Sequence, residues 1–475
     1  MVRGPHLTQQ LLDQAIRTEA AARKAGLDFF EVVFEPLDAR DVNAVAAYTG
    51  FPSRYSSWRF GMEFERLQKG YEYGLSKIYE LVINNDPTVA YLVKSNSFME
   101  QKLVMAHVFG HADFFKHNVW FGATDRRMHE RMEQHAETVR RLMERHGQDQ
   151  VEVFLDEALS LESMVDPYLP LREQLRNGGA AEPTGTGMAE RARAAFEATM
   201  EDPSAPKRPT ASPKRDMPTY DVLGFLLEHA PLPSWKRDLL HIVREEAYYF
   251  MPQRMTKIMN EGWASFWHSK LLTQGLLDTS EVVEFADCHS GATATRPGQL
   301  NPYKFGIELF RHAERKGMDI FRLRRVHNDV SFIDEVVDEE FAAESQLFLI
   351  KKNGRTGKSE VAGRNFQAVK SQLLRDLAWC GAPRVQLTAV TEEGCLELVH
   401  QHDGRDLKLD EAGQLLTQLS RLWGAPAHLL TLEEGQGRRM ISDGETVKVL
   451  EARSAEEACA DAEGAQPSDD GKRAG

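Results

Sequence analysis

The stretch that most constrains the fold is SNSFMEQKLVMAHVFGHADFFKHN, residues 95–118. Ser97 and Glu100 match the S-x-x-E capping box, in which each side chain accepts the backbone N–H of the other residue at the start of a helix. An apolar stripe follows, formed by Leu103, Val104, Phe114 and Phe115. The pattern predicts a helix that begins at this box and packs its apolar face into a core.

Two histidines, His107 and His111, lie on the same stripe. Four residues are about one helical turn, so both imidazoles face the same way and can reach one divalent metal ion. The alternative is a pair of hydrogen-bonded core histidines. The spacing resembles the zinc-protease motif H-E-x-x-H, but Val108 stands where that motif has its glutamate. Either another residue supplies a general base, or the site binds metal without hydrolysis.

A second helix is predicted over NEGWASFWHSK, residues 260–270. Glu261 and His268 are seven residues apart and therefore differ by only about 20° around the helix. The neighbouring Ala264 and Ser265 are small, which favours close approach of another helix. Some helical metallopeptidases take their third zinc ligand from such a helix, one set from a similar EGWA segment. Glu261 would complete a His₂Glu site with an open fourth position, zinc being the first choice. Alternatively, the Glu261 side chain caps a neighbouring helix or forms a hydrogen bond with it.

Two further residues are candidates for catalysis. Glu246 falls on the apolar face of the predicted helix 235–253, where a carboxylate must be paired or have a raised pKa. It is a candidate general base or extra ligand, or the acid of a buried ion pair with an arginine. His268 is a candidate to accept a proton from metal-bound water or to stabilise a transition state. We read His289 as part of a glycine-containing loop and favour a structural role for it, as for Asn328.

The pattern along the chain predicts a mainly α fold. Residues 1–345 are predicted to form a large helical domain, and one interpretation is that its helical core is zincin-like. A Gly/Pro-rich insertion at about 177–218 interrupts this domain and is predicted to be mobile. Residues 346–450 form a small α+β domain. The acidic tail 451–475 shows no periodicity and is predicted to be disordered.

Strand signals are few. The segment 27–35, LDFFEVVFE, fits either a short strand or a turn of buried helix. Residues 385–400 alternate in two runs around a turn at Glu393 and Gly394, which predicts a hairpin.

Composition limits the partners. Asp and Glu number 72 against 58 Lys and Arg, a net charge of −14, which argues against nucleic-acid binding and against docking on an anionic membrane. The four cysteines never form a C-x-x-C pair. We find neither a signal peptide nor an apolar run long enough for membrane insertion, and we expect a cytoplasmic protein.

Taken in order, further blocks between about residues 20 and 345 make the chain resemble the stage V sporulation protein R (SpoVR) family. These blocks are GLDFFEVVFE, YTGFPSRYSSWRFGMEFERL, YGLSKIYELVINNDP, REEAYYFMPQ, LNPYKFGIELF and RRVHNDVSFIDE. The resemblance implies a role in spore cortex formation, or in stress response in bacteria without endospores. It also implies two companions, a PrkA-type serine protein kinase and a von Willebrand-like protein.

Two functions follow. We favour a regulator or scaffold with a buried His/Glu metal site, because the glutamate after His107 is missing. The alternative is a metal-dependent hydrolase acting on a peptide or peptidoglycan-related bond. Whether the chain is an enzyme stays open at this point.

Overall fold

The computed structural model describes residues 2–72, 80–176, 217–295, 300–352 and 359–452. Helices dominate, as predicted, and most of the strands belong to two sheets. Contacts divide the chain into two compact units, each built from two segments. Unit 1 comprises Met1–Glu152 and Tyr249–Gly381, and unit 2 comprises Val153–Tyr248 and Ala382–Gly475.

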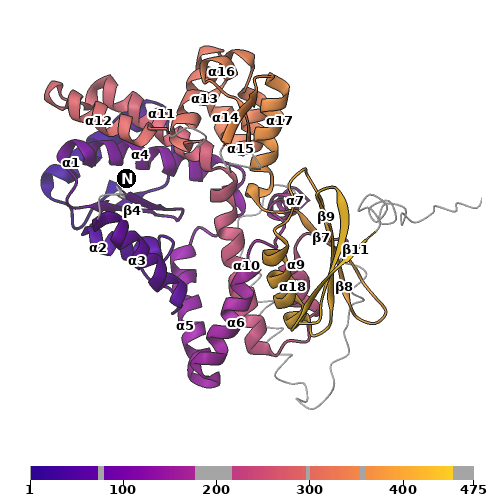
Figure 1. Cartoon of the computed structure of the whole chain (residues 1–475). Coiled ribbons are helices and arrows are strands. Elements are labelled where there is room, and N and C mark those ends of the chain that lie inside the picture. The colour runs from indigo at the N-terminus through magenta and orange to yellow at the C-terminus, as the bar shows by residue number, and fades with distance from the viewer. Residues whose placement is uncertain (1, 73–79, 177–216, 296–299, 353–358, 453–475) are drawn as a thin grey trace, which may run out of the picture. The chain divides into compact units, whose positions relative to one another are not determined.

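Unit 1 contains a four-stranded sheet with the strand order β1-β2-β4-β3. Its strands are β1 (Val2–Arg3), β2 (Val32–Leu37), β3 (Glu80–Ile83) and β4 (Thr88–Val93). The pairs β1–β2 and β2–β4 are parallel, and β3 is antiparallel to β4. Helices cover both faces of this sheet (Figure 1). They are α1 (Gln9–Lys24) and α4 (Phe98–His117) on one side, and α2 (Ala39–Ala47) and α3 (Trp58–Glu72) on the other. The ambiguous segment 27–35 therefore leads into a strand.

The remaining elements of unit 1 are mostly helices from its second segment. They are α5 (Met128–His146), α11 (Lys257–Leu271), α12 (Val282–Thr293), α13 (Pro302–Arg315), α14 (Ile320–Val326), α15 (Asp329–Val336), α16 (Glu339–Glu344) and α17 (Phe366–Leu377). Short helical turns are η1 (Phe121–Ala123), η3 (Leu272–Leu276), η4 (Thr279–Glu281) and η5 (Ala378–Gly381). A small antiparallel pair joins β5 (Leu349–Lys352) to β6 (Ser359–Gly363).

Small residues let the central helices of unit 1 approach closely. A Cβ added to Gly110 of α4 would lie 2.7 Å from the Cα of Ala264 on α11. A Cβ added to Gly262 would lie 2.5 Å from the backbone of Gly306 on α13. Both distances are shorter than real Cβ contacts, so α11 is clamped between α4 and α13 at positions that require small residues. This agrees with the close helix approach predicted from the small residues of α11.

Substitution of Gly262 by alanine should therefore destabilise the fold. We expect Gly262→Ala to lower the free energy of unfolding by about 1–3 kcal/mol, the usual cost of overpacking a core. The matched control is Gly61→Ala on α3, where an added Cβ meets nothing within 4 Å. That change should raise the free energy of unfolding by up to about 1 kcal/mol through helix propensity. Urea denaturation measures both, and equal stability of the two variants would contradict the clamp.

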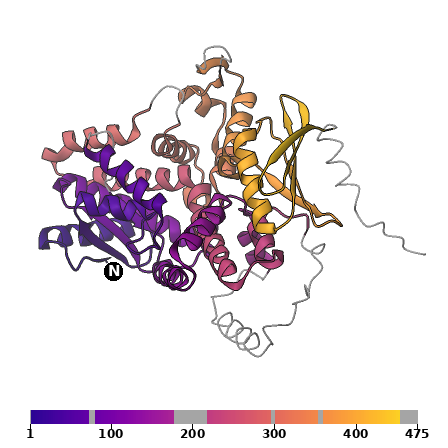
Figure 2. The same ribbon diagram turned by 60° about the horizontal axis from the view of Figure 1, so that its bottom comes forward.

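Unit 2 is built around a five-stranded sheet with the order β11-β10-β9-β8-β7. Its strands are β7 (Val385–Val390), β8 (Leu396–His400), β9 (Ala427–Glu433), β10 (Gln436–Ser442) and β11 (Val447–Glu451). The predicted hairpin is confirmed: β7 and β8 pair antiparallel, and Gly394 in their turn has a φ of +84°. Helix α18 (Leu409–Trp423) lies along this sheet (Figure 2) and connects the parallel strands β8 and β9.

Four further helices lie in the described part of the chain. Helices α7 (Leu169–Arg176) and α9 (Val222–His229) belong to unit 2, whereas α6 (Gln148–Ser160) and α10 (Ser234–Met255) run across the divisions of the chain between the two units. The predicted insertion at about 177–218 and the predicted tail 451–475 lie almost entirely outside the described residues. The domain boundary at residue 345 stays a prediction. In the described part of the chain, no helix combines the length and the apolar character that crossing a membrane requires.

Candidate metal centre

Helix α4 begins at the predicted capping box. The Ser97 backbone N–H donates to Glu100 Oε2 at 2.7 Å, and the Glu100 backbone N–H donates to Ser97 Oγ at 3.1 Å. From this start, nearly every residue from Met99 to Phe115 is buried. The box fixes where the helix starts, and hence which way His107 and His111 point.

The start of α11 is held from another helix. Asp329, at the first position of α15, accepts the backbone N–H groups of Ile258 at 2.9 Å and of Met259 at 2.8 Å. These amides belong to the first turn of α11 and have no partner within the helix itself. Burial raises the pKa of Asp329 to about 7. The two bonds fix the first turn of α11, from which Glu261 follows directly.

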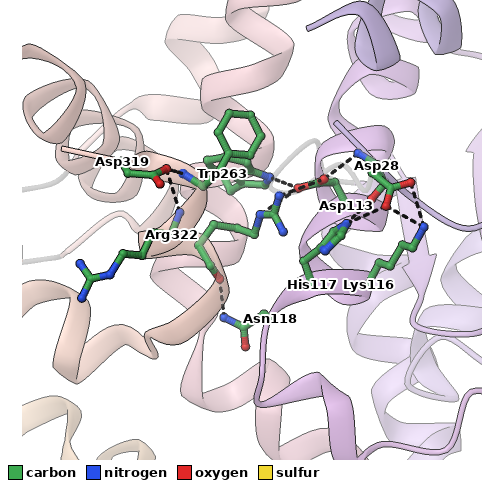
Figure 3. Close-up of polar contacts among 10 residues, drawn as sticks. Asp28, Asp113, Lys116, His117, Asn118, Trp263, Asp319 and Arg322 are labelled. Carbon is green, nitrogen blue, oxygen red and sulfur yellow. Dashed lines mark hydrogen bonds and ion pairs between the residues drawn. The ribbon is translucent and has the colours of Figure 1, made fainter. Parts of the chain in front are cut away.

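Asp113 of α4 is a buried carboxylate that bonds to both α11 and α14. Its Oδ2 accepts the indole N–H of Trp263 on α11 at 2.9 Å (Figure 3). The same oxygen forms an ion pair with Arg324 Nε on α14 at 3.1 Å. Asp113 Oδ1 accepts the backbone N–H of Asp28 at 2.9 Å. Burial raises the pKa of Asp113 to about 6, although the charge of Arg324 opposes this. Asp113 is two residues from His111, so this network also sets the position of the histidines.

His107, His111 and Glu261 come together as predicted. Glu261 Oε2 lies 3.5 Å from His107 Nε2 and 3.5 Å from His111 Nε2. The three ligand atoms all lie within 4.8 Å of one another. The residues are 3%, 6% and 7% exposed, so the group is buried. Within the described part of the chain, it is the one group of His, Cys, Asp and Glu whose spacing could hold a metal ion.

Other polar side chains occupy the outer atoms of these three residues. Lys257 Nζ donates to Glu261 Oε1 at 2.7 Å, which leaves Oε2 as the carboxylate oxygen that faces the histidines. His111 Nδ1 lies 2.8 Å from Asn260 Oδ1, and His107 Nδ1 lies 2.9 Å from His268 Nδ1. Each histidine therefore uses Nδ1 for an outer contact and turns Nε2 toward Glu261.

The electrostatics keep the carboxylate ionised. Burial alone would raise the pKa of Glu261, but the imidazoles of His107 and His111 and the ammonium of Lys257 outweigh it and hold that pKa well below its ordinary value. Burial, reinforced by the neighbouring histidines, holds the pKa of His268 well below its ordinary value. The group thus offers one carboxylate, and beside it stands a neutral His268.

These dimensions suit a tetrahedral ion. Zinc binds histidine nitrogen and carboxylate oxygen at about 2.0–2.2 Å, and tetrahedral geometry then separates neighbouring ligand atoms by about 3.4 Å. The two separations of 3.5 Å from Glu261 Oε2 are close to this value. They are also longer than ordinary N–H···O hydrogen bonds, which cluster near 2.9–3.0 Å. The buried group could therefore hold a divalent metal ion.

The two candidates for catalysis are placed differently. His268 lies on α11 beside His107, contacting its Nδ1 rather than the Nε2 that faces Glu261. Glu246 is buried on α10 within unit 2, whereas the three ligand candidates belong to unit 1. The catalytic roles of both residues stay predictions.

Sequence reasoning missed two residues around the group, Lys257 and Asn260, and placed a third, His289, in the wrong kind of element. Lys257 precedes Glu261 by four residues, an ion-pair spacing on a helix that could have been read from the sequence. Asn260 gave no signal beyond its position next to Glu261. His289 was expected in a loop, which was wrong: it lies on helix α12, and its Nδ1 is 3.1 Å from His268 Nε2. Asn328 has the structural role expected for it, because it caps α15.

Comparison with known proteins identifies the family of the chain. The family model "SpoVR like protein" matches residues 6–382. The uncharacterized protein YcgB of Escherichia coli (strain K12) is 27% identical over 471 residues, covering 89% of this chain and 92% of YcgB. No solved structure matches the chain. Since the family model covers well over half of its length, the chain belongs to the SpoVR family.

Proposed function

We propose that this chain is a metal-binding protein whose ligands are His107, His111 and Glu261. The observation that carries the proposal is the convergence of two imidazole Nε2 atoms and one carboxylate oxygen inside the core. Burial of an ionised carboxylate is costly unless a positive partner compensates it. Lys257 binds only Oε1, so a cation between Oε2 and the histidines would supply the rest of that compensation.

Zinc is the proposed ion. A set of two imidazoles and one carboxylate is a donor set that zinc takes in proteins, with a fourth position left for water or another ligand. Imidazole also suits copper, iron and nickel, whereas calcium and magnesium prefer sites made only of oxygen. The donor chemistry therefore favours a transition metal, and zinc first among them.

As to the biological role, we propose that the protein is a regulator or scaffold in sporulation, in spore cortex formation, or in stress response. Family membership supports this role. A PrkA-type serine protein kinase and a von Willebrand-like protein are the proposed partners, and the cytoplasm is the proposed location. In this role, the metal would hold α4 against α11 and so add to the stability of unit 1.

The alternative is a metal-dependent hydrolase acting on a peptide or peptidoglycan-related bond. A bound zinc ion would lower the pKa of a water at the fourth position, and such an enzyme needs a base beside that water. Val108 occupies the position that carries this base in H-E-x-x-H enzymes. His268 and Glu246 are the replacement candidates, but His268 contacts the outer face of His107. We therefore place the regulator first.

Elemental analysis of protein purified without an affinity tag tests the metal site. We expect about one equivalent of a transition metal, zinc first, per wild-type chain. Almost none is expected in His107→Ala/His111→Ala, because Glu261 would be the one protein ligand left and cannot hold the ion by itself. A matched control is His6→Ala/His241→Ala, whose imidazoles are 72% and 43% exposed. This control should keep the full equivalent.

Two outcomes decide against parts of the proposal. If wild-type protein from metal-supplemented medium were folded by far-UV circular dichroism but contained no metal, the proposed metal site would be wrong. Hydrolysis of peptide or peptidoglycan fragments by the zinc-loaded wild type, lost in His107→Ala/His111→Ala, would place the hydrolase ahead of the regulator.

A further inference from the structure

Three histidines form a continuous chain that begins at a proposed ligand. His107 Nδ1 lies 2.9 Å from His268 Nδ1, and His268 Nε2 lies 3.1 Å from His289 Nδ1. These residues come from α4, α11 and α12 in turn. His107 and His268 are buried, whereas His289 is partly exposed. The chain thus leads from the metal centre to the surface of unit 1.

Each contact between two of these histidines needs one proton between the two nitrogens. Which nitrogen of His107 binds the metal determines which nitrogen carries that proton. A neutral imidazole has one N–H and one acceptor nitrogen. If His107 binds a cation through Nε2, its proton must be on Nδ1, which then donates to His268 Nδ1. His268 must in turn carry its proton on Nε2 and donate to His289 Nδ1. Metal binding at one end therefore fixes the donor direction of the whole chain.

The opposite direction is incompatible with metal. If His289 Nδ1–H donated to His268, then His268 Nδ1–H would donate to His107 Nδ1. The proton of His107 would then lie on Nε2, facing Glu261 Oε2 and blocking the ligand position. The hydrogen bonds among the three histidines therefore have two possible directions, of which only one allows His107 to bind a cation.

The second ligand histidine has a partner of the same kind. His111 Nδ1 lies 2.8 Å from Asn260 Oδ1, and an amide oxygen can only accept. His111 must therefore carry its proton on Nδ1 and present Nε2 as an acceptor. Each of the two histidine ligand candidates can thus donate its Nδ1 proton to a neutral acceptor on α11, the helix that also carries Glu261.

We propose that His268, supported by His289, and Asn260 are positioning residues of the metal centre that hold His107 and His111 in the tautomer that presents Nε2 to the ion. The inference rests on the proposed metal site. Outer partners of ligating histidines fix the tautomer and ring orientation, and their loss typically costs 10–100-fold in metal affinity. The partners here are neutral rather than carboxylates, so the charge near the ion comes from Glu261 and Lys257.

The test compares two nearly isosteric variants, His268→Leu and His268→Asn. Leucine removes the acceptor that faces His107, whereas the asparagine oxygen can replace Nδ1. We expect zinc affinity, measured by chelator competition, to fall about 10–100-fold in His268→Leu and to stay within a few-fold of wild type in His268→Asn. A smaller loss is expected for His289→Leu, which leaves the first contact intact.

A spectroscopic readout separates positioning from a merely structural effect. In ¹¹³Cd-loaded, ¹⁵N-histidine-labelled wild type, cadmium should couple to Nε2 of His107 and His111, and both Nδ1 atoms should carry protons. Cadmium coupling to Nδ1 of His107 would overturn the proposal even if no His268 variant folded. Equal zinc affinity of wild type, His268→Leu and His268→Asn would also overturn it. Failure of the wild type to bind any metal would instead overturn the proposed function.

Discussion

Glu261→Gln should weaken zinc binding by more than about 100-fold while leaving the fold intact. The change keeps the size and shape of the side chain but removes the one anionic ligand, so its effect should exceed the 10–100-fold typical of outer partners. Thermal unfolding gives a second measure. At zinc concentrations of about 1,000 times the wild-type Kd, the wild type should gain about 4 kcal/mol of stability, whereas Glu261→Gln should gain less than about 1.5 kcal/mol at the same concentration.

The matched control for this prediction is Glu314→Gln on α13, which removes an ion pair with Lys270 near the surface. Surface ion pairs contribute little, so this variant should bind zinc as the wild type does. If Glu261→Gln and Glu314→Gln bound zinc equally well, the carboxylate of Glu261 would not be a ligand.

Arg324→Met should destabilise unit 1 by about 3–5 kcal/mol, the usual consequence of leaving a buried charge without its partner. Asp113 is fully buried and Arg324 nearly so, at a separation of 3.1 Å. The double variant Asp113→Asn/Arg324→Met should be more stable than Arg324→Met alone. The asparagine oxygen can replace only one of the two carboxylate oxygens, which accept from Trp263 and from the Asp28 backbone N–H, but the double variant leaves no buried charge. Urea denaturation of the three proteins measures the difference.

This effect should depend on pH. The folded-state pKa of Asp113, about 6, is above its unfolded value of 3.8, so the folded state binds more protons between these values and loses stability as the pH rises through them. Removal of Arg324 takes away the charge that lowers this pKa, so the loss continues to higher pH in Arg324→Met. The variant should therefore differ from wild type more at pH 8 than at pH 5. An equal difference at both pH values would contradict the assignment.

Local signals in the sequence were sufficient for α4 and for two members of the candidate centre. A capping box sets the start of a helix, and the spacing of His107 from His111 puts both on one face of it. Glu261 was predicted from the resemblance of its EGWA segment to one that supplies a zinc ligand in helical metallopeptidases. The family resemblance pointed to the same segments. The hairpin of unit 2 was equally readable, because its two runs alternate and Gly394 supplies the positive φ of the turn.

What the sequence could not provide was the identity of neighbours. The sheet of unit 1 was missed because strands buried on both faces read as continuous apolar runs, which a buried helix also shows. Periodicity placed Glu246 on an apolar face but cannot say which element packs there. His289 was read as a loop residue because Gly291 follows two residues later, yet an added Cβ at Gly291 meets nothing within 4 Å and the helix continues through it. Contacts between distant segments, such as His268 with His289, have no local signal.

A crystal structure of the zinc-soaked protein, with anomalous diffraction recorded on both sides of the zinc edge, tests the metal centre most directly. Zinc bound at this centre should give one strong anomalous peak in the core, about 2.0–2.2 Å from His107 Nε2, His111 Nε2 and Glu261 Oε2. Zinc found only at surface side chains, with Glu261 Oε2 still facing the two imidazoles and no peak between them, would contradict the proposed metal centre.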